Sequence, residues 1–288
     1  MRVDVVQTVD AIRERLQPLH LSQDLMGLVP TMGAFHDGHL SLIRKARQGC
    51  GFVVVSIFVN PQQFGPGEDF RTYPQMLESD LAHCEELGVD VVFAPTVGEM
   101  YPEEQLAFVE VEKLGDHLCG VHREGHFKGV ATVVLKLLSI VQPDRAYFGE
   151  KDVQQLAIVR RMVHDLNFQV EIVPVSVVRE SDGLAMSSRN QYLQPEERER
   201  APLLYRVLQI AKEQIEAGET VAQPILGKAR RVLEEEPLIE VDYLELVDPE
   251  QMQPVSDVTG PVRVCAAIRI GSARLIDNVL CNPSVPTL

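Results

Sequence analysis

Residues 29–47 read VPTMGAFHDGHLSLIRKAR, and this stretch decides the fold that we expect. The apolar residues 25–29 have the composition of a buried strand, and the spacing of apolar residues after Gly38 is typical of a helix. The two histidines, His36 and His39, therefore fall in a turn between a strand and a helix. In α/β folds, turns of this kind bind nucleotides.

The same alternation of strand and helix patterns continues to about residue 180. Apolar runs rich in β-branched residues predict strands at 25–29, 52–59, 89–93, 145–148 and 170–178. Amphipathic spacing predicts helices at 39–49, 74–87, 129–141 and 152–166. This alternation is typical of a parallel sheet with right-handed crossovers. We therefore expect an α/β fold, a Rossmann-like doubly wound parallel sheet, with a nucleotide-binding domain at residues 1–179.

The pattern changes in the C-terminal part, residues 180–288. One long helical pattern begins at Pro195 and runs to Gly218, and a second covers residues 220–235. Three strand patterns follow, at 239–247, 262–270 and 273–277. We expect a smaller α+β domain here, which could act as a lid over a bound nucleotide.

Composition excludes several classes of protein. The chain of 288 residues has a formal net charge of −15, which disfavours a nucleic-acid partner because phosphate backbones need clustered cations. We find no apolar run of about 18 residues and no signal-peptide core, so we expect no membrane partner and a cytoplasmic location. The five cysteines form no CxxC pair, so we expect reduced thiols rather than disulfides or a zinc site.

The histidine turn can be interpreted in two ways. Helix N-termini carry unpaired N–H groups and a partial positive charge, so phosphates bind there, and His36 and His39 could donate to phosphate oxygens. The alternatives are a zinc-binding pair or a simple surface turn, but only Asp37 is nearby as a further ligand. The chain contains neither GxxxxGK[ST] nor GxGxxG, which disfavours a Walker-type loop and a dehydrogenase.

Three further polar segments follow predicted strands. GEKD at 149–152 offers Lys151 for phosphate oxygens, and Asp152 could hold Mg²⁺ or cap a helix. The motif MSSR at 186–189 offers hydroxyls and a guanidinium, which bind phosphate well. Taken by itself, this motif would be interpreted as an ordinary polar loop. In the segment 60–64, neutral amides suit a small polyol acid, and a capping loop is the alternative.

The histidines at positions 117, 122 and 126 form a loose cluster in the sequence. Gaps of five and four residues across glycines give no regular ligand geometry. We therefore expect solvent-facing histidines on a loop rather than a metal site.

The motif HxGH after a strand resembles the HIGH-type motif of a nucleotidyltransferase superfamily that includes class I aminoacyl-tRNA synthetases. AMSSRN at 185–190 resembles its second, KMSKS-like signature. The segments FVNPQQFGPGEDFRTYP (58–74), REGHFKGVATVVLKLL (123–138) and YFGEKDVQQL (147–156) resemble the pantothenate synthetase (pantoate–β-alanine ligase) family. The likeness is dense from about residue 25 to 193 and weaker beyond.

This resemblance implies a specific activity, the ATP-dependent condensation of (R)-pantoate with β-alanine through a pantoyl adenylate, with Mg²⁺ and as a homodimer. It implies that His39 is the proton donor, assisted by His36, Lys151 and Arg189. The residues that it implies for ATP are Met32, Gly33, His36, His39, Gly149, Glu150, Lys151, Asp152, Val178, Met186, Ser187, Ser188 and Arg189. Those implied for pantoate and β-alanine are Asn60, Gln63, Tyr73, Arg123 and Gln155.

The sequence departs from the family at one position, because Glu124 stands where we expect proline. An acid there could draw the guanidinium of Arg123 aside. Two other functions compete with ligation: a related nucleotidyltransferase with a phosphorylated acceptor, and a nucleotide-binding regulator without chemistry. The amides at 60–64 disfavour the former, because a phosphorylated acceptor would favour cations. The presence of His39 and Lys151 disfavours the latter.

Overall fold

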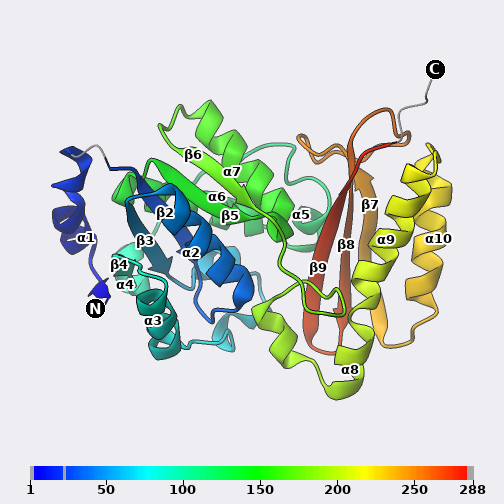
Figure 1. The fold of residues 1–288 in the computed structure, drawn as a ribbon, viewed down its shortest axis with the longest axis horizontal. Coiled ribbons are helices and arrows are strands. Elements are labelled where there is room, and N and C mark those ends of the chain that lie inside the picture. Colours follow the sequence, from blue (N-terminus) through cyan, green and yellow to red (C-terminus); the bar gives the residue numbers. More distant parts are fainter. Residues whose placement is uncertain (1–2, 22–23, 284–288) are drawn as a thin grey trace. The chain divides into compact units, whose positions relative to one another are not determined.

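The computed structural model describes residues 3–21 and 24–283, and the chain forms two compact units (Figure 1). The first unit consists of residues 1–111, 123–150 and 158–176. The second unit consists of residues 112–122, 151–157 and 177–288. In the part of the chain that the structure describes, no helix is long and apolar enough to cross a membrane.

The first unit contains a parallel sheet with the strand order β1–β4–β3–β2–β5–β6. Its strands are β1 (Asp4–Val6), β2 (Met26–Thr31), β3 (Phe52–Ile57), β4 (Val91–Phe93), β5 (Arg145–Gly149) and β6 (Glu171–Val175). The central strands are buried on both faces, which explains their nearly continuous apolar sequences. The predicted parallel sheet is confirmed.

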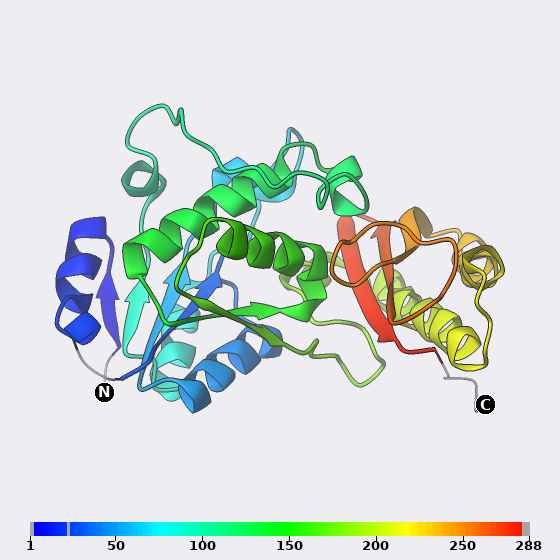
Figure 2. The same cartoon turned by 90° about the horizontal axis from the view of Figure 1, so that it is seen from above.

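Helices connect these strands. They are α1 (Val9–Leu16), α2 (Asp37–Gly49), α3 (Leu77–Glu86), α4 (Val97–Met100), α6 (His126–Val141) and α7 (Val153–Asp165). Short 3₁₀ turns lie between them: η1 (Leu19–Leu21), η2 (Pro61–Gln63), η3 (Asp69–Arg71) and η4 (Glu150–Asp152). Figure 2 shows α2 and α6 on opposite faces of the sheet, so the fold is doubly wound as predicted.

The strand order reverses between β2 and β5. After β2 the chain adds β3 and β4 on one side, and it then crosses to add β5 and β6 on the other. In open α/β sheets, ligands bind outside the carboxyl ends of the strands at such a reversal. These ends are Thr31 in β2 and Gly149 in β5, so the topology places a candidate site beside both.

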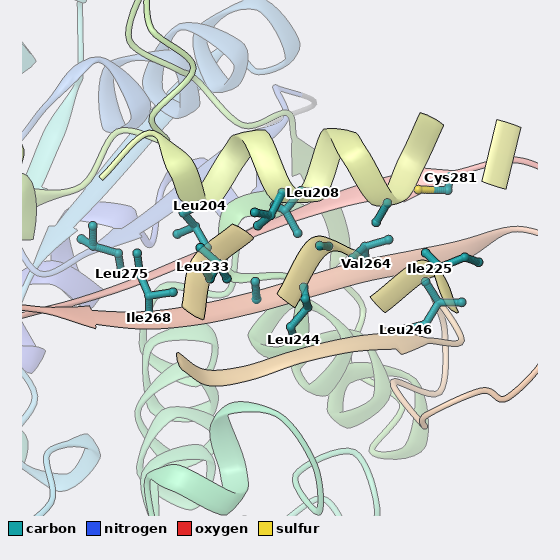
Figure 3. Packing of buried hydrophobic residues seen from close by; sticks show 14 of the residues in the cluster. Leu204, Leu208, Ile225, Leu233, Leu244, Leu246, Val264, Ile268, Leu275 and Cys281 are labelled. Carbon is teal, nitrogen blue, oxygen red and sulfur yellow. The ribbon is translucent and has the colours of Figure 1, made fainter. Parts of the chain in front are cut away.

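The second unit contains an antiparallel sheet in the order β7–β8–β9. Its elements are α5 (Cys119–His122), η5 (Ser188–Tyr192), α8 (Pro195–Arg200), α9 (Leu203–Glu216), α10 (Ala222–Glu234), β7 (Ile239–Val247), β8 (Val262–Ile270) and β9 (Ala273–Cys281). Figure 3 shows Leu204 and Leu208 of α9 and Leu233 of α10 directed at the sheet, where they join a cluster of buried hydrophobic residues that includes Val264 and Ile268. The predicted α+β architecture is confirmed here.

Three expectations differ from the structure. The single helix predicted from Pro195 to Gly218 is wrong, because α8 ends at Arg200 and α9 begins at Leu203. Pro202 lies at the break, where its ring and missing N–H prevent the helix from continuing. The last strand extends to Cys281, and the pair β1 and α1 at the N-terminus was not predicted at all.

Candidate active site

The turn between β2 and α2 has an unusual backbone that a distant carboxylate holds. Gly33 and Ala34 both have positive φ, of 82° and 53°. Asp80 of α3 is 1% exposed, and its carboxylate accepts the N–H groups of Ala34 and Phe35, each at 2.8 Å. Burial raises the pKa of Asp80 even though these two hydrogen bonds favour the charged form. A Cβ at position 33 would crowd the Asp80 carboxylate. Glycine therefore suits this position both because φ is positive and because the carboxylate lies so close.

His36 and His39 lie side by side at the start of α2. Their ring centroids are 4.1 Å apart and the rings are tilted by 38°. The Nδ1 of His36 accepts the Gly38 N–H at 3.1 Å, and the Nδ1 of His39 accepts the His36 N–H at 3.4 Å. A ring nitrogen that accepts an N–H carries no proton, so in both histidines the proton is on Nε2. The pair therefore offers two Nε2–H donors at a helix N-terminus, where oxyanions bind.

Asn60 and Gln63 follow the end of β3 and are both buried, at 1% and 9% exposure. The Oδ1 of Asn60 accepts the Gln62 N–H and caps η2, as expected for a capping loop. The Nδ2 of Asn60 donates to Gln63 Oε1 at 3.1 Å, and the Nε2 of Gln63 donates to Met32 Sδ at 3.2 Å. The structure therefore brings the amides of the 60–64 segment to the histidine turn through Met32.

Helix α6 packs against this amide segment. The Nδ2 of Asn60 donates to the carbonyl of Gly129 at 3.2 Å. A Cβ at Gly129 would collide with the carbonyl of Gln62, so only glycine permits the approach. Tyr73 is also buried beside the segment, with its ring centroid 5.9 Å from that of Phe64.

Arg123 and His126 fix the backbone of Gln63. The Arg123 guanidinium binds both carboxylate oxygens of Glu68, at 2.6 and 2.7 Å, and donates to the Gln63 carbonyl at 3.3 Å. His126 lies 2.8 Å from the same carbonyl through Nδ1 and 2.8 Å from Arg123 through Nε2. Burial opposes ionisation of Glu68, but the hydrogen bonds and charge of Arg123 outweigh it and lower its pKa to about 2.

Two expectations are corrected by this cluster. His126 is 8% exposed and hydrogen-bonded, so the prediction that it faces solvent is wrong, whereas His122 is exposed. Arg123 pairs with Glu68, 55 residues away, and this pairing rather than Glu124 sets its direction. The sequence separation between these partners is the reason that no local pattern revealed them.

The GEKD segment spans the two units. Gly149 and Glu150 belong to the first unit, beside the reversal of strand order, while Lys151, Asp152 and Gln155 belong to the second. Within the second unit, the Nδ2 of Asn278 in β9 donates to the Lys151 carbonyl at 3.0 Å. The backbone that carries the lysine is therefore attached to the C-terminal sheet.

The neighbouring Gln154 has a structural role that the sequence did not reveal. Its amide is 5% exposed and binds Leu114, His117 and Cys119 of the second unit. These three hydrogen bonds fix the loop before α5. Gln155, for which the family resemblance implies pantoate binding, is half-buried on the same helix.

The loop that carries the MSSR motif is folded onto itself. The Met186 N–H donates to the Val178 carbonyl at 3.0 Å, and the Ser187 hydroxyl accepts the Arg189 N–H at 3.3 Å, which caps η5. Arg198 of α8 binds Glu180 and Asp182, the residues that precede the motif, at 2.5 and 2.6 Å. Ser187 is thus a cap in addition to any role with phosphate.

The structure also bears on the metal and thiol expectations. Among the described residues, no group of three or more His, Cys, Asp or Glu side chains could hold a metal ion. The five cysteines are free and buried, as predicted.

These features define a class before any comparison is made. A doubly wound sheet that places amides and two imidazole N–H donors at its strand ends is the architecture of an α/β nucleotide-binding enzyme.

Known proteins agree with this class and narrow it. Residues 4–280 match the model of the pantoate-beta-alanine ligase family. The pantothenate synthetase of Fervidobacterium nodosum is 50% identical over 278 residues, which are 96% of this chain and 99% of that protein. The crystal structure of the pantothenate synthetase of Thermus thermophilus has a TM-score of 0.91 at 50% identity, covering 96% of this chain and 99% of that one.

A third relative was solved with ligands. The pantoate-beta-alanine ligase of Francisella tularensis, complexed with β–γ ATP and β-alanine, has a TM-score of 0.81 at 34% identity and covers 96% of this chain and 97% of that one. The present chain belongs to the pantoate–β-alanine ligase family. The predicted family, fold class and amide-forming ligase activity in pantothenate synthesis are confirmed at this level. The individual residue roles stay predictions.

Proposed function

We propose that this chain condenses (R)-pantoate with β-alanine at the expense of ATP and releases pantothenate, AMP and pyrophosphate through a pantoyl adenylate. The observation that carries the proposal is the pair of Nε2–H donors of His36 and His39 at the N-terminus of α2. Because the chain belongs to this ligase family, we assign these donors to the charge that gathers on a phosphate during adenylation.

The chemistry explains why ATP is needed. A carboxylate resists attack by an amine because its carbon is electron-rich and oxide is a poor leaving group. In the first step, a carboxylate oxygen of pantoate bonds to the α-phosphorus of ATP, and the bond from that phosphorus to the α,β-bridging oxygen breaks to release pyrophosphate. In the second step, the amine of β-alanine bonds to the carbonyl carbon, the acyl–phosphate bond breaks to release AMP, and the amine loses a proton. Alignment and charge stabilisation then supply most of the rate.

His39 and His36 are proposed to stabilise the charge that develops on the α-phosphate. Because Nδ1 of each ring accepts a backbone N–H, the group presented to the nucleotide is the neutral imidazole N–H. His39 therefore acts as a hydrogen-bond donor in the first step. The family resemblance implies that His39 is the proton donor. To transfer its Nε2 proton and remain neutral, the ring would have to take up a proton at Nδ1, which now accepts the His36 N–H. Met32 and Gly33 of the same turn are proposed to contact ATP through the backbone.

Residues of the other predicted segments are assigned to ATP as well. Lys151 and Arg189 are proposed to bind phosphate oxygens, because their fixed positive charges favour pyrophosphate as it leaves. Further contacts are proposed for Gly149, Glu150, Val178, Met186, Ser187 and Ser188. Mg²⁺ is proposed to arrive with ATP and to neutralise phosphate charge. The half-buried carboxylate of Asp152 suits it, because Mg²⁺ takes one or two carboxylates together with phosphate oxygens.

Pantoate and β-alanine are proposed to bind the amide segment. Gln63 is buried with its Nε2 directed at Met32, and Asn60 and Tyr73 shape the surroundings. Gln155 is proposed as a second amide for pantoate. Arg123 is proposed to contribute mainly by holding the Gln63 carbonyl, because its guanidinium is also engaged with Glu68.

Assembly and location also belong to this proposal. We propose a cytoplasmic homodimer without nucleic-acid or membrane partners. The net charge of −15 supports the absence of a nucleic-acid partner. Sedimentation equilibrium of the purified chain tests the dimer, and a monomer at micromolar concentration would contradict it.

The decisive experiment separates the two half-reactions. The protein is mixed with ATP, Mg²⁺ and pantoate, and pyrophosphate is measured, after which β-alanine is added and AMP is measured. We expect pyrophosphate up to about one equivalent per site without β-alanine, and AMP and pantothenate only after its addition. Release of AMP that is independent of β-alanine would contradict ligation. No pyrophosphate at any stage would indicate a nucleotide-binding regulator.

Gln63→Ala tests the placement of pantoate. We expect kcat/KM for pantoate to fall by at least about tenfold, because a buried donor to the substrate is lost, while the KM for ATP stays within about twofold. Weakened ATP affinity with unchanged pantoate kinetics would reverse the assignment. Gln253→Ala, in an exposed loop of the second unit, is the control for removal of a glutamine side chain.

A further inference from the structure

Tyr101, just after α4, contacts the amide segment through Asn60. Its hydroxyl lies 2.8 Å from Asn60 Oδ1. Burial raises the pKa of Tyr101 to about 12, so the hydroxyl keeps its proton at neutral pH. The phenol can therefore act as a donor to a carbonyl oxygen.

The direction of every hydrogen bond at Asn60 is fixed by its partners. The Gln62 N–H can only donate, at 3.3 Å, so the atom facing it is the oxygen Oδ1. The Gly129 carbonyl can only accept, at 3.2 Å, so the atom facing it is Nδ2. The Tyr101 hydroxyl therefore donates to Oδ1. This hydrogen bond, at 2.8 Å, is shorter than the one from the Gln62 N–H to the same oxygen, at 3.3 Å.

The orientation of Asn60 sets that of Gln63. The second hydrogen of Asn60 Nδ2 points at Gln63, so the acceptor atom of Gln63, Oε1, faces it at 3.1 Å. The Nε2 of Gln63 must then point the other way, towards Met32 Sδ at 3.2 Å. A thioether is a weak acceptor, so a substrate oxygen in that place would be a better partner for the amide N–H.

We infer that Tyr101 is a positioning residue for the acid substrate. By donating to Asn60 Oδ1, it adds a third anchor to the polarity that the Gln62 N–H and the Gly129 carbonyl set, and so holds the Asn60–Gln63 pair in the position in which Gln63 presents its Nε2–H group, rather than its carbonyl oxygen, to the substrate. The site thereby favours ligands that offer hydroxyl or carboxylate oxygens at this point. The inference rests on the proposed role of Gln63 in binding pantoate.

Tyr101→Phe tests the inference with little change in packing. The ring keeps its contacts with Phe58, at 6.2 Å between centroids, and with Lys136 Nζ, which lies 4.7 Å from the Tyr101 ring centroid. We expect kcat/KM for pantoate to fall about fivefold to tenfold, on the scale of one buried hydrogen bond, with the KM for ATP unchanged. An unchanged kcat/KM for pantoate, or an equal loss for both substrates, would overturn the inference.

Tyr147→Phe is the matched control. It removes a phenolic hydroxyl from Tyr147, a buried tyrosine of the first unit whose hydroxyl lies 3.3 Å from Cys50 Sγ. We expect some loss of thermal stability and wild-type pantoate kinetics. If Tyr147→Phe lowers kcat/KM for pantoate as much as Tyr101→Phe does, the effect is general destabilisation and the inference fails.

A double-mutant cycle distinguishes positioning from structural support. If Tyr101 acts through Gln63, adding Tyr101→Phe to Gln63→Ala should change kcat/KM for pantoate by less than about twofold. A further fivefold loss in that background would overturn the inference.

The proposed function has a separate test. It fails if the wild-type chain forms no pyrophosphate with pantoate and ATP. Calorimetric titration of pantoate into the ATP-free variants adds a readout that does not depend on turnover.

Discussion

The histidine turn of the first unit and the MSSR loop of the second unit are both proposed to bind ATP phosphates, but different forces hold them. The turn is stabilised by Asp80, which is 1% exposed and accepts hydrogen bonds from two of its backbone N–H groups. The loop has backbone hydrogen bonds of its own, such as that from the Met186 N–H to the Val178 carbonyl, but its support from α8 is Arg198. The side chain of Arg198 is 32% exposed, and those of its partners Glu180 and Asp182 are 29% and 38% exposed. Buried backbone contacts resist salt and solvent, whereas half-exposed ion pairs are screened. We therefore expect the support of the turn by Asp80 to be insensitive to salt, and the support of the loop by Arg198 to weaken as the salt concentration rises.

The largest effect should come from the turn itself. We expect His39→Ala to lower the rate of pyrophosphate release in the first half-reaction by at least about a hundredfold, the usual scale for one electrostatic donor. Rapid-quench measurement of pyrophosphate checks this. His164→Ala, at a side chain 82% exposed in the same unit, should leave the rate unchanged. Near-normal adenylation in His39→Ala would remove the turn from the chemistry.

Asp80→Ala tests whether the turn needs its distant support. The substitution leaves the buried N–H groups of Ala34 and Phe35 without their acceptor, so we expect the free energy of unfolding to fall by about 2–3 kcal/mol and kcat to fall as well. Urea titration and steady-state kinetics measure the two effects. Asp90→Ala is the control, because Asp90 also accepts a backbone N–H, from Val53, but at the opposite end of β3. Equal kcat losses in both variants would show that general stability, not the turn, matters.

A pair of glycine substitutions compares helices of the two units. We expect Gly129→Ala in α6 to lower the free energy of unfolding by about 1–3 kcal/mol, because the new methyl collides with the Gln62 carbonyl. Gly227→Ala in α10 meets open space and should raise it by about 0.5–1 kcal/mol through helix propensity alone. Urea midpoints decide the signs. A stabilised Gly129→Ala would mean that the amide segment does not pack against α6 as described.

The pH dependence of stability tests the Glu68–Arg123 pair. The pKa of Glu68 is lowered from 4.5 to about 2, so its contribution is present above pH 4.5 and is lost as the pH falls towards 2. Because the carboxylate is partly exposed, we expect Glu68→Gln to abolish only about 1–2 kcal/mol of this pH-dependent stability. Unfolding free energies from about pH 6 down to about pH 3, an interval that should reveal part of the change, measure it. Glu103→Gln, at an exposed position, should follow the wild-type curve.

The smallest effect should come from the MSSR loop. We expect Arg198→Ala to change the free energy of unfolding by less than about 1 kcal/mol and to raise the KM for ATP about twofold to threefold, mainly at low salt. ATP kinetics at two ionic strengths check this. Arg230→Ala, which breaks an exposed pair with Glu234 in the same unit, should leave the KM unchanged. A tenfold rise that persists at high salt would make the loop as rigidly specified as the turn.

Local patterns were sufficient for some parts of the site and insufficient for others. The strand before the histidine turn and the helix after it follow from apolar spacing, and the glycine at position 33 fits the positive φ of the turn between them. No pattern revealed Asp80, Tyr101 or Glu68, because each acts on residues about 40 or more positions away. The break at Pro202 was visible in the sequence, but the strong helical spacing on both sides concealed it.

The sequence by itself determined the alternation of strands and helices, the family and the identity of the groups that we propose for ATP, because these depend on residue type and on neighbours a few positions apart. The tertiary structure decided what orients those groups. It alone shows that backbone N–H groups place the proton of His36 and His39 on Nε2, and that the Gln62 N–H and the Gly129 carbonyl set the polarity of Asn60 and, through it, of Gln63. A hydrogen bond has a direction only when both partners are in place, and folding is what brings distant partners together.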